Sequence, residues 1–469
     1  MKKLIAGVLC VCMLSALVIG CEKTEESTTA TTDAATTADA GDDTTESEEG
    51  GSTETGIINL WSFTDEVPNM VDKYIELNPE FGERYEIVST VISTTDNAYE
   101  PALDAALAGG GADAPDLYCA EAAFVIKYCS GDASSYAATY ESLGIDIDAA
   151  IEEAGIAQYS IEVGSNADGE VVGLGYQATG GAFIYRRSIA TDTFGTDEPA
   201  SIASEVGPGW DKFFEAAATL KDAGYAIVSG DGDIWHAIEN SSEDGWIVDG
   251  ALVIDPLREE FLDYSLMLKE NGYSNDTQDW TEAWYGDMAG TAATQVFGFF
   301  GPAWLINYVI ADHCGGTAVG EGTYGDWAVC DSPIGFFWGG TWLIPAAGTD
   351  VPEGVAEILT WITLDCSETG LQYMWANGEF GAAKDSVASA TVMAMSDGTL
   401  DILAGQNMFD VFVPANEFAN GSNLTQYDGT INGYWRDQVR QYTAGEKTRD
   451  EAIAGFKQMV ADNLDVVVE

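Results

Sequence analysis

The sequence predicts an α/β protein of two lobes with a ligand cleft between them. From residue 56 to the end of the chain, short apolar runs alternate with segments of helical periodicity. This alternation is typical of α/β folds with largely parallel sheets. About 410 residues follow residue 56, which is more than one small hydrophobic core organises. Two lobes are therefore expected.

The first stretch of this alternation runs from residue 56 to the Pro-Asp pair at Pro115 and Asp116. Pro68 suits the first turn of a helix, and three glycines from Gly109 onward end the next one. Strands are expected at 56–63, at 85–92 and from residue 115, and helices at 67–77 and 99–108.

The rest of the chain continues the pattern, with glycines and prolines between the periodic segments. Strands are expected at 181–185, 225–229, 295–300, 327–330 and 341–344, and helices at 210–223, 257–271, 355–364 and 434–465, the last broken at Gly445.

The N-terminal 56 residues have a different character. Residues 1–20 combine two lysines with an apolar run that ends in glycine, which is the pattern of a secretory signal peptide. Cys21 follows at once, so we expect cleavage before it and a diacylglycerol on its thiol. The alternative is an ordinary signal peptide with a chance cysteine. Residues 21–56 are acidic and rich in Thr, and we expect a disordered tether.

This N-terminal pattern predicts where the protein works. No other run of eighteen apolar residues occurs, so the mature chain is expected to be anchored to a membrane rather than embedded in it. We expect a lipoprotein on the extracellular face of the cytoplasmic membrane, as on a Gram-positive-like cell surface.

Charge excludes one class of partner. The chain has 78 acidic and 18 basic residues, for a net charge of −60. Nucleic-acid binding is not expected, because phosphate backbones require basic patches. The charge favours a soluble, surface-displayed protein.

Cysteine and histidine usage gives no sign of a cofactor or a metal. The chain has two histidines and no C-x-x-C motif, so a zinc site is not expected. Five cysteines follow Cys21, and an odd number leaves at least one of them unpaired. Their spacing in the sequence allows two disulfides, Cys119 with Cys129 and Cys314 with Cys330, and would leave Cys366 unpaired.

Aromatic and acidic residues at strand ends suggest the ligand. Sugar rings stack on indole and phenol rings, and their hydroxyls bind short polar side chains. Each candidate has an alternative role in the core or in a turn. The candidates are Trp61 and Ser62 at the end of the first strand, Asp65 and Glu66 after it, Asp116 and Glu121 around the third, and Trp235, Trp284, Tyr285, Trp304, Trp338 and Gly339 further along.

In their order, these segments resemble the family 1 extracellular solute-binding proteins, the maltose-binding-protein-like group. The resemblance covers roughly residues 57–465. It is carried by the opening strand at 58–63, the glycine stop and Pro-Asp strand at 106–118, the strand, proline turn and Trp-Asp-Lys-Phe helix start within 183–213, the Gly-Pro turn at 300–304, the strand at 338–345 and the helix pair around 443–452.

The resemblance implies two lobes joined by three crossings, which close on a ligand by hinge motion. It implies lobe one at 57–175 and 336–385, and lobe two at 176–335 and 386–469. It also implies a monomer that delivers its solute to the permease subunits of an ABC transporter, and no catalysis. Trp235 and Trp304 resemble aromatic residues that face the family's cleft.

The ligand is expected to be a neutral mono- or oligosaccharide, because no basic residue falls in the segments assigned to the cleft. One alternative is the same fold binding another solute, such as a peptide or a polyamine. A second is a cell-surface carbohydrate-active enzyme, which would need two opposed carboxylates. No catalytic motif supports the enzyme.

Overall fold

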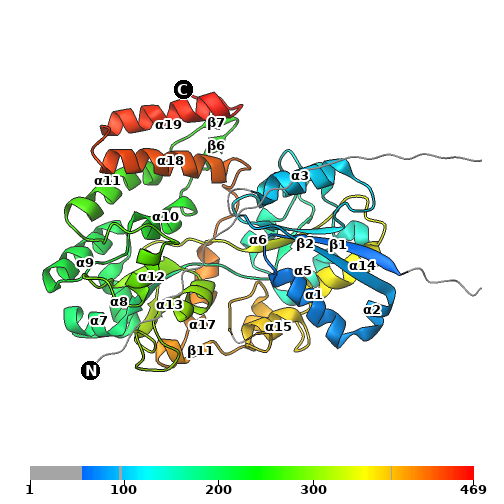
Figure 1. The fold of residues 1–469 in the computed structure, drawn as a ribbon, viewed down its shortest axis with the longest axis horizontal. Coiled ribbons are helices and arrows are strands. Elements are labelled where there is room, and N and C mark those ends of the chain that lie inside the picture. Colours follow the sequence, from blue (N-terminus) through cyan, green and yellow to red (C-terminus); the bar gives the residue numbers. More distant parts are fainter. Residues whose placement is uncertain (1–54, 95–97, 382) are drawn as a thin grey trace, which may run out of the picture. The chain divides into compact units, whose positions relative to one another are not determined.

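Two β-sheets organise the chain in the computed structural model, which describes residues 55–94, 98–381 and 383–469. Each sheet has its own group of helices (Figure 1). The signal peptide, Cys21 and nearly all of the predicted tether lie outside the described residues. No helix within these three ranges has the length and apolarity to cross a membrane.

The sheet of lobe one has the strand order β2-β1-β3-β10-β4. β1 runs parallel to β2 and β3, whereas β10 runs antiparallel to β3 and β4. Ile58 and Leu60 of β1 are fully buried, as is Leu117 of β3. The strands are β1 (Gly56–Ser62), β2 (Tyr85–Val91), β3 (Leu117–Glu121), β4 (Leu174–Gly175) and β10 (Thr341–Pro345).

Helices cover this sheet because their apolar positions recur at helical spacing. In α1, for example, Val67, Met70 and Val71 are buried against the sheet core. The helices of lobe one are α1 (Glu66–Leu77), α2 (Pro79–Arg84), α3 (Tyr99–Gly109), α4 (Val125–Cys129), α5 (Ile147–Ala154), α6 (Gln158–Val163), α14 (Pro352–Leu359), α15 (Leu371–Ala376) and α16 (Ala390–Met393), with the π-helix η5 (Thr360–Leu364) and the short 3-10 turns η2 (Ser134–Tyr136) and η3 (Glu141–Leu143).

The sheet of lobe two has the order β8-β5-β9, from β5 (Ala182–Arg186), β8 (Gly298–Gly301) and β9 (Trp327–Cys330). Both pairings are antiparallel. The expectation of largely parallel sheets is therefore wrong for these strands. β5 carries the chain away from lobe one and β9 leads it back, so the two neighbours run in opposite directions.

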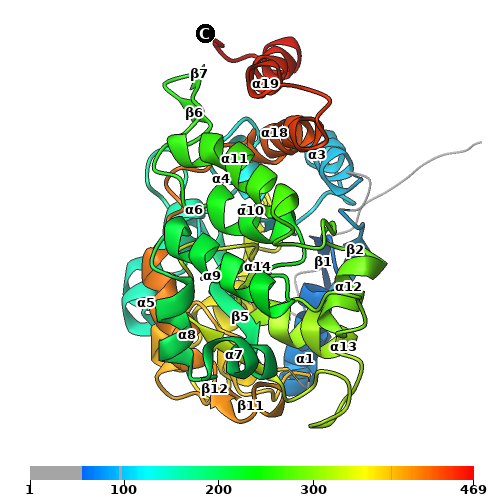
Figure 2. The ribbon, with the colours of Figure 1, turned by 90° about the vertical axis from the view of Figure 1, so that its left-hand side faces the viewer.

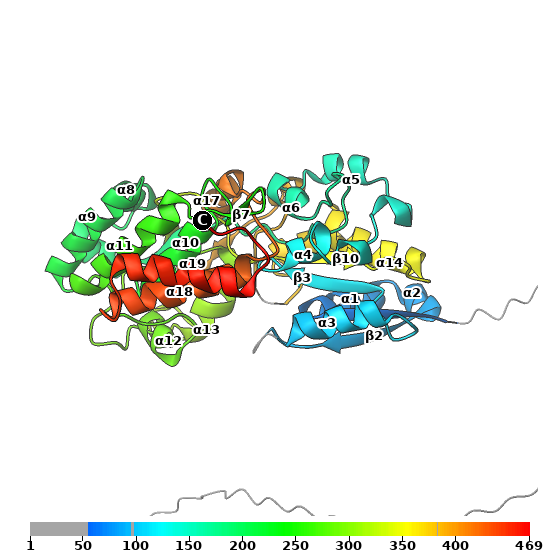
Figure 3. The same cartoon turned by 90° about the horizontal axis from the view of Figure 1, so that it is seen from above.

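The helices of lobe two pack around this sheet, and α18 lies between α11 and the antiparallel α19 (Figures 2 and 3). They are α7 (Arg187–Phe194), α8 (Pro199–Val206), α9 (Trp210–Ala223), α10 (Asp231–Glu239), α11 (Pro256–Glu270), α12 (Glu282–Met288), α13 (Ala311–His313), α17 (Phe409–Ala415), α18 (Asp428–Thr443) and α19 (Arg449–Asn463), with the π-helix η4 (Leu305–Ile310), the 3-10 turns η6 (Asp401–Leu403) and η7 (Asn416–Phe418), and the strand pairs β6 (Ile247–Val248) with β7 (Ala251–Leu252) and β11 (Thr399–Leu400) with β12 (Gln406–Asn407).

Two local expectations differ from the structure. The strand expected at 225–229 is reduced to isolated bridges from Ala226 and Val228, which pair with Val296 and Ser274. The helix expected at 355–364 is an α-helix that widens into the π-helix η5.

The predicted boundaries after residues 175 and 335 fall between strands of different sheets. Because α16 packs on α5 and α15, we propose that lobe one extends through α16.

Five cysteines of the described residues carry free thiols. Neither pairing left open by the spacing is formed. Cys119 and Cys129 are both fully buried, and burial raises the pKa of the Cys119 thiol to about 12. These cysteines act as small apolar core residues.

Candidate functional site

A cavity of about 550 Å³ lies where the two lobes meet. Lobe one contributes Glu121 and the two alanines that follow β3. Lobe two contributes one face of α10 and the first turns of α18, together with Trp280 and Trp304. The segment from Phe337 to Gly339, which crosses between the lobes ahead of β10, forms a further wall. We call this cavity the cleft.

Three tryptophans dominate the cleft. Trp304 and Trp338 meet edge to face, with ring centroids 4.7 Å apart. Trp280 lies parallel to Trp304 at 6.3 Å and meets Trp338 at 6.0 Å. Trp304 and Trp338 are half-buried, while Trp280 is 51% exposed. The Nε1 of Trp304 donates a hydrogen bond to the carbonyl of Trp338 at 3.2 Å, which fixes these two rings together.

His236 supports this cluster from α10. Its ring lies against that of Trp338, and its two nitrogens contact Glu239 at 3.4 Å and Asp279 at 3.2 Å. Burial lowers the pKa of His236, but the bonds to Asp279 and Glu239 outweigh burial and raise it above its usual value. Asp279 also accepts a hydrogen bond from Arg436 at 3.2 Å. Burial raises the pKa of Asp279, but His236 and Arg436 outweigh it and lower the pKa.

Glu121 lies at the lobe-one wall. Its Oε2 accepts a hydrogen bond from the backbone N–H of Ala123 at 2.8 Å. Burial raises the pKa of the Glu121 carboxyl to about 7, partly offset by this bond. Gly339 faces it with a φ of 74°, and a Cβ at that position would lie 3.6 Å from Glu121 Oε1. That distance is an ordinary contact, so it is the left-handed backbone that favours glycine at this position.

The cleft contains a basic residue, although none was expected in the segments assigned to it. Arg436, which lies in the helix expected at 434–465 and outside the segments assigned to the cleft, is one of the residues that line it. The guanidinium of Arg436 forms an ion pair with Asp279, so its positive charge is compensated. Four carboxylates line the same cavity, from Glu121, Glu239, Asp279 and Asp428, and they outnumber the cations. The preference against an anionic ligand therefore stands on this excess of acid and not on an absence of basic residues.

Five of the twelve candidate residues line the cleft: Glu121, Trp235, Trp304, Trp338 and Gly339. Trp235 is only 1% exposed, and its ring packs on Phe261 at 4.8 Å, so it supports the wall more than it faces the cavity.

Trp284 and Tyr285 lie behind the cleft in α12. The fully buried Trp284 donates a hydrogen bond to Asp233 at 3.1 Å. Tyr285 stacks on His313 with ring centroids 3.8 Å apart. Neither side chain lines the cleft.

The candidates at the end of β1 and just after it lie outside the cleft lining. Trp61 packs against the core around β3, and Ser62 is fully buried. Asp65 is exposed at the start of α1. Glu66 accepts a hydrogen bond from the hydroxyl of Tyr176. Burial, Asp385 and Asp65 together raise the pKa of Glu66 to about 8.

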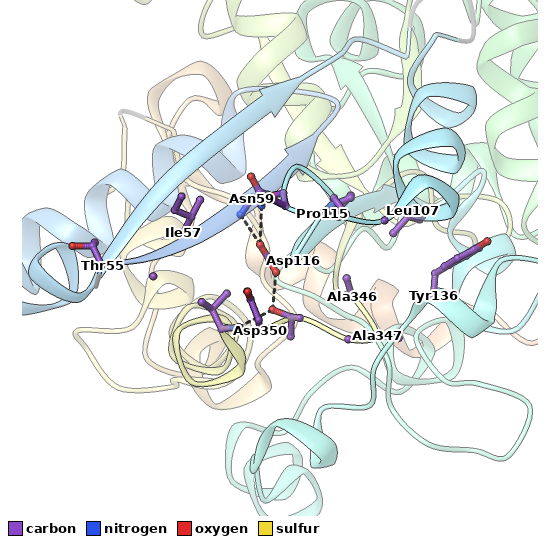
Figure 4. Close-up of a pocket in the computed structure, with 18 residues that line it drawn as sticks. Thr55, Ile57, Asn59, Leu107, Pro115, Asp116, Tyr136, Ala346, Ala347 and Asp350 are labelled. Atoms are coloured by element: carbon purple, nitrogen blue, oxygen red, sulfur yellow. Dashed lines mark hydrogen bonds between the residues drawn. The ribbon is translucent and has the colours of Figure 1, made fainter. Parts of the chain in front are cut away.

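Asp116 lies at the opposite end of β3 from Glu121 and lines a different pocket of about 750 Å³ (Figure 4). Its Oδ2 accepts hydrogen bonds from the backbone N–H and the side chain of Asn59, at 2.9 and 3.1 Å. Its Oδ1 accepts one from Thr349 at 2.8 Å. Asp116 thus ties β1 to the chain after β10, a structural role.

Sequence reasoning did not select His236, Asp279, Trp280 or Arg436. One signal was present, because Asp279 and Trp280 stand together in a polar segment, the pairing that marked the other candidates. Among the described residues, no group of three or more His, Cys, Asp and Glu is placed to hold a metal ion. What the cleft offers is aromatic faces and carboxylate oxygens for binding a small solute.

The family model for bacterial extracellular solute-binding proteins matches residues 76–399. The chain belongs to this family. A comparison with curated protein sequences finds no significant match. The family binds solutes outside the cytoplasm, and this solute-binding protein has the corresponding two-lobe fold.

Solved structures share the fold of this solute-binding protein at low sequence identity. The galacto-N-biose/lacto-N-biose I-binding protein of Bifidobacterium longum, in complex with lacto-N-biose, is 15% identical with a TM-score of 0.65, covering 88% of this chain and 99% of that one. A transporter-associated binding protein of B. animalis subsp. lactis, in complex with β-1,6-galactobiose, is 18% identical with a TM-score of 0.60, covering 87% and 97%. One from Thermotoga lettingae, bound with α-D-tagatose, is 16% identical with a TM-score of 0.61, covering 87% and 99%.

Proposed function

We propose that this solute-binding protein captures a neutral mono- or oligosaccharide in the cleft and delivers it to the permease subunits of an ABC transporter. The observation that carries the proposal is the cluster of Trp280, Trp304 and Trp338 beside Glu121. Indole faces stack on the C–H faces of sugar rings, and carboxylate oxygens accept bonds from sugar hydroxyls. Several structures that share the fold hold saccharides, which supports the same ligand class.

The solute-binding site proposed here comprises the three tryptophans, Glu121 and Gly339. Binding is expected to bring the lobes together around the hinge crossings. A thermal-shift panel of neutral mono-, di- and trisaccharides tests the ligand class, with lacto-N-biose, β-1,6-galactobiose and tagatose among them. At a hundredfold excess over the dissociation constant, a ligand stabilises its protein by about 2.7 kcal/mol. Tighter binding of uronic acids or sugar phosphates than of neutral sugars would overturn the assignment of a neutral ligand.

A polyamine is the second candidate solute. The excess of carboxylates over cations in the cleft favours it, because ammonium groups bind carboxylates and the faces of tryptophan rings. Including putrescine and spermidine in the same thermal-shift panel distinguishes a polyamine ligand from a neutral saccharide. Stabilisation by spermidine, which falls steeply with added salt while neutral sugars have no effect, would favour the polyamine.

We also propose that Cys21 carries a lipid anchor and that the segment 21–56 tethers the solute-binding protein to the extracellular face of the membrane. The support is the apolar run that ends in Gly20, followed by Cys21 and an acidic, Thr-rich segment. The family's extracellular location agrees with such an anchor.

A further inference from the structure

Lobe one contains a cavity of about 1090 Å³ that is separate from the cleft, because no described residue lines both. We call it the lobe-one groove. Its walls are the end of α1, the turn after η3, one side of α5, the junction of α14 with η5, and α15 with the turns on either side of it. At the junction an α-helix widens into a π-helix, and such irregularities are frequent at functional sites.

The floor of the lobe-one groove is apolar. The rings of Tyr74 and Trp361 meet there with centroids 5.1 Å apart, and Met374 lines the same floor. The Nε1 of Trp361 donates a hydrogen bond to the carbonyl of Thr369 at 2.9 Å, which fixes the indole in the wall. Leu77 also lines the groove, and its side chain is 46% exposed. A partner that covered Leu77 would remove apolar surface from water.

The rim of the lobe-one groove is acidic. In the part of the chain that the structure describes, six carboxylates line the groove and no Lys, Arg or His does. Of these six, only Glu357 forms an ion pair within the described ranges, with Arg84 at 2.6 Å. The last turn of α1, at residues 74–77, carries no basic residue, so the partial negative charge of this helix end adds to that of the carboxylates. The six are Asp146, Glu153, Glu357, Asp365, Glu368 and Glu379.

Charge and size limit what can cover this groove. With a net charge of −60, the chain repels a second copy of itself, an anionic membrane surface and its own acidic segment 21–56. The volume also exceeds the range of about 300–1000 Å³ that small-molecule sites occupy. An apolar floor inside an acidic rim is complementary to a segment that carries apolar residues on one face and Lys or Arg beside them, as in amphipathic helices that bind in grooves.

We propose that the lobe-one groove is a docking site for a basic amphipathic segment of a partner protein. The apolar face of the segment covers Leu77 and Trp361. Its Lys or Arg side chains pair with the exposed carboxylates of Glu153, Glu368 and Glu379. This docking is independent of the solute that the cleft binds, since the two sites lie apart.

The probe is a fluorescein-labelled synthetic peptide of Lys and Leu, about 14 residues long, with its leucines on one helical face. Fluorescence anisotropy measures its affinity for the intact protein. The groove variant carries Glu153→Gln, Glu368→Gln and Glu379→Gln, and the control variant carries Glu205→Gln, Glu270→Gln and Glu446→Gln. Both lose three exposed charges, and the control positions are in lobe two. We expect the groove variant to bind the peptide about tenfold more weakly and the control variant to stay within about twofold of the wild type.

The apolar floor is tested separately. We expect Leu77→Gln to weaken peptide binding by about threefold or more. Met267→Gln is the control, because Met267 is 37% exposed on α11 and lies outside the groove lining. A second peptide of the same composition, with its leucines scattered around the helix, should bind more weakly than the amphipathic one. Thermal unfolding near the wild-type temperature shows that each variant is folded.

Three results would overturn the docking site. Equal losses in the groove and control variants would show that the peptide follows only the net charge of the chain. Equal affinity for the two peptides would remove the role of the apolar floor. Tighter binding of phenethylamine than of the peptide would make the groove a site for a small cation. A protein that binds the peptide as expected but no sugar would overturn the proposed function and leave this inference standing.

Discussion

The imidazole of His236 lies flat against the indole of Trp338, with ring centroids 3.5 Å apart and planes 13° apart. His236 belongs to α10 of lobe two, whereas Trp338 lies on the crossing that leads back to lobe one. The stack therefore joins a helix of one lobe to the segment between the lobes. The orientation of Trp338 in the cleft depends on a residue that the sequence did not single out.

Two tryptophans at the cleft should respond differently to truncation. We expect Trp338→Ala to weaken sugar binding by about 1.5–3 kcal/mol, the range for burying a large apolar side chain. We expect Trp235→Ala to lower the free energy of unfolding by about 3–5 kcal/mol, because Trp235 is 1% exposed and leaves a cavity. Titration calorimetry measures the sugar affinity of both variants, and urea unfolding measures their stability. Equal effects of the two on stability would contradict the expected contrast.

Protonation of His236 should stabilise the fold. Its folded pKa is raised through Asp279 and Glu239, so its contribution is complete below the unfolded value of about 6.5 and is lost as pH rises through the folded pKa. Glutamine does not titrate. The difference in unfolding temperature between the wild type and His236→Gln should therefore be largest near pH 6 and shrink toward pH 9. A difference that is constant across this range would contradict the expectation.

Removing the charge of Glu66 should stabilise the protein at high pH. Its pKa of about 8 means that the folded state favours the protonated acid. That favourable contribution is complete below the unfolded value of about 4.3 and is lost as pH rises through about 8. We expect Glu66→Gln to match the wild type near pH 4 and to unfold at a higher temperature near pH 9. Glu141→Gln, at an exposed position, is the control and should show no such trend.

Thiol chemistry should distinguish one cysteine of the folded part. Cys366 is partly exposed, whereas the other four described cysteines are buried. Iodoacetamide should modify Cys366 first in the native protein and the remaining thiols only after unfolding. Peptide mass spectrometry locates the adducts. A cross-linked peptide joining Cys119 to Cys129, or an unfolding temperature that falls with reductant, would contradict the free thiols.

The anchor is tested in the native host. Replacing Cys21 with alanine should release the protein from membranes into the medium or the soluble fraction, because the thiol that receives the lipid is gone. Fractionation and immunoblotting measure the distribution. A variant that stays with the membranes as the wild type does would show that another feature holds the protein there.

The sequence by itself determined the elements with strong local signals. The helix expected at 210–223 is α9 (Trp210–Ala223), which begins after one glycine and ends before another. Strands such as β1 and β10 were likewise visible in their apolar composition. The order of these segments carried the family resemblance, and the family model confirms it.

Only the tertiary structure decided which side chains meet. Trp235 and His236 are neighbours on α10, yet one packs on Phe261 and the other on Trp338. Successive residues of a helix point about 100° apart, and composition does not say which side faces a cavity. For Asp116 and Glu121, too, the sequence does not say which side chain faces the cavity. Five residues at about 3.3 Å each put them at opposite ends of β3, with only Glu121 at the cleft.

The network around Asp279 shows the same limit over longer distances. His236 and Arg436 are 43 and 157 residues away in sequence. No local pattern records such a pairing, because a hydrogen bond between side chains depends on where the folded backbone brings them. The pairing of Asp279 with His236 and Arg436 was therefore beyond the reach of the sequence, since it exists only after α10, α12 and α18 have packed.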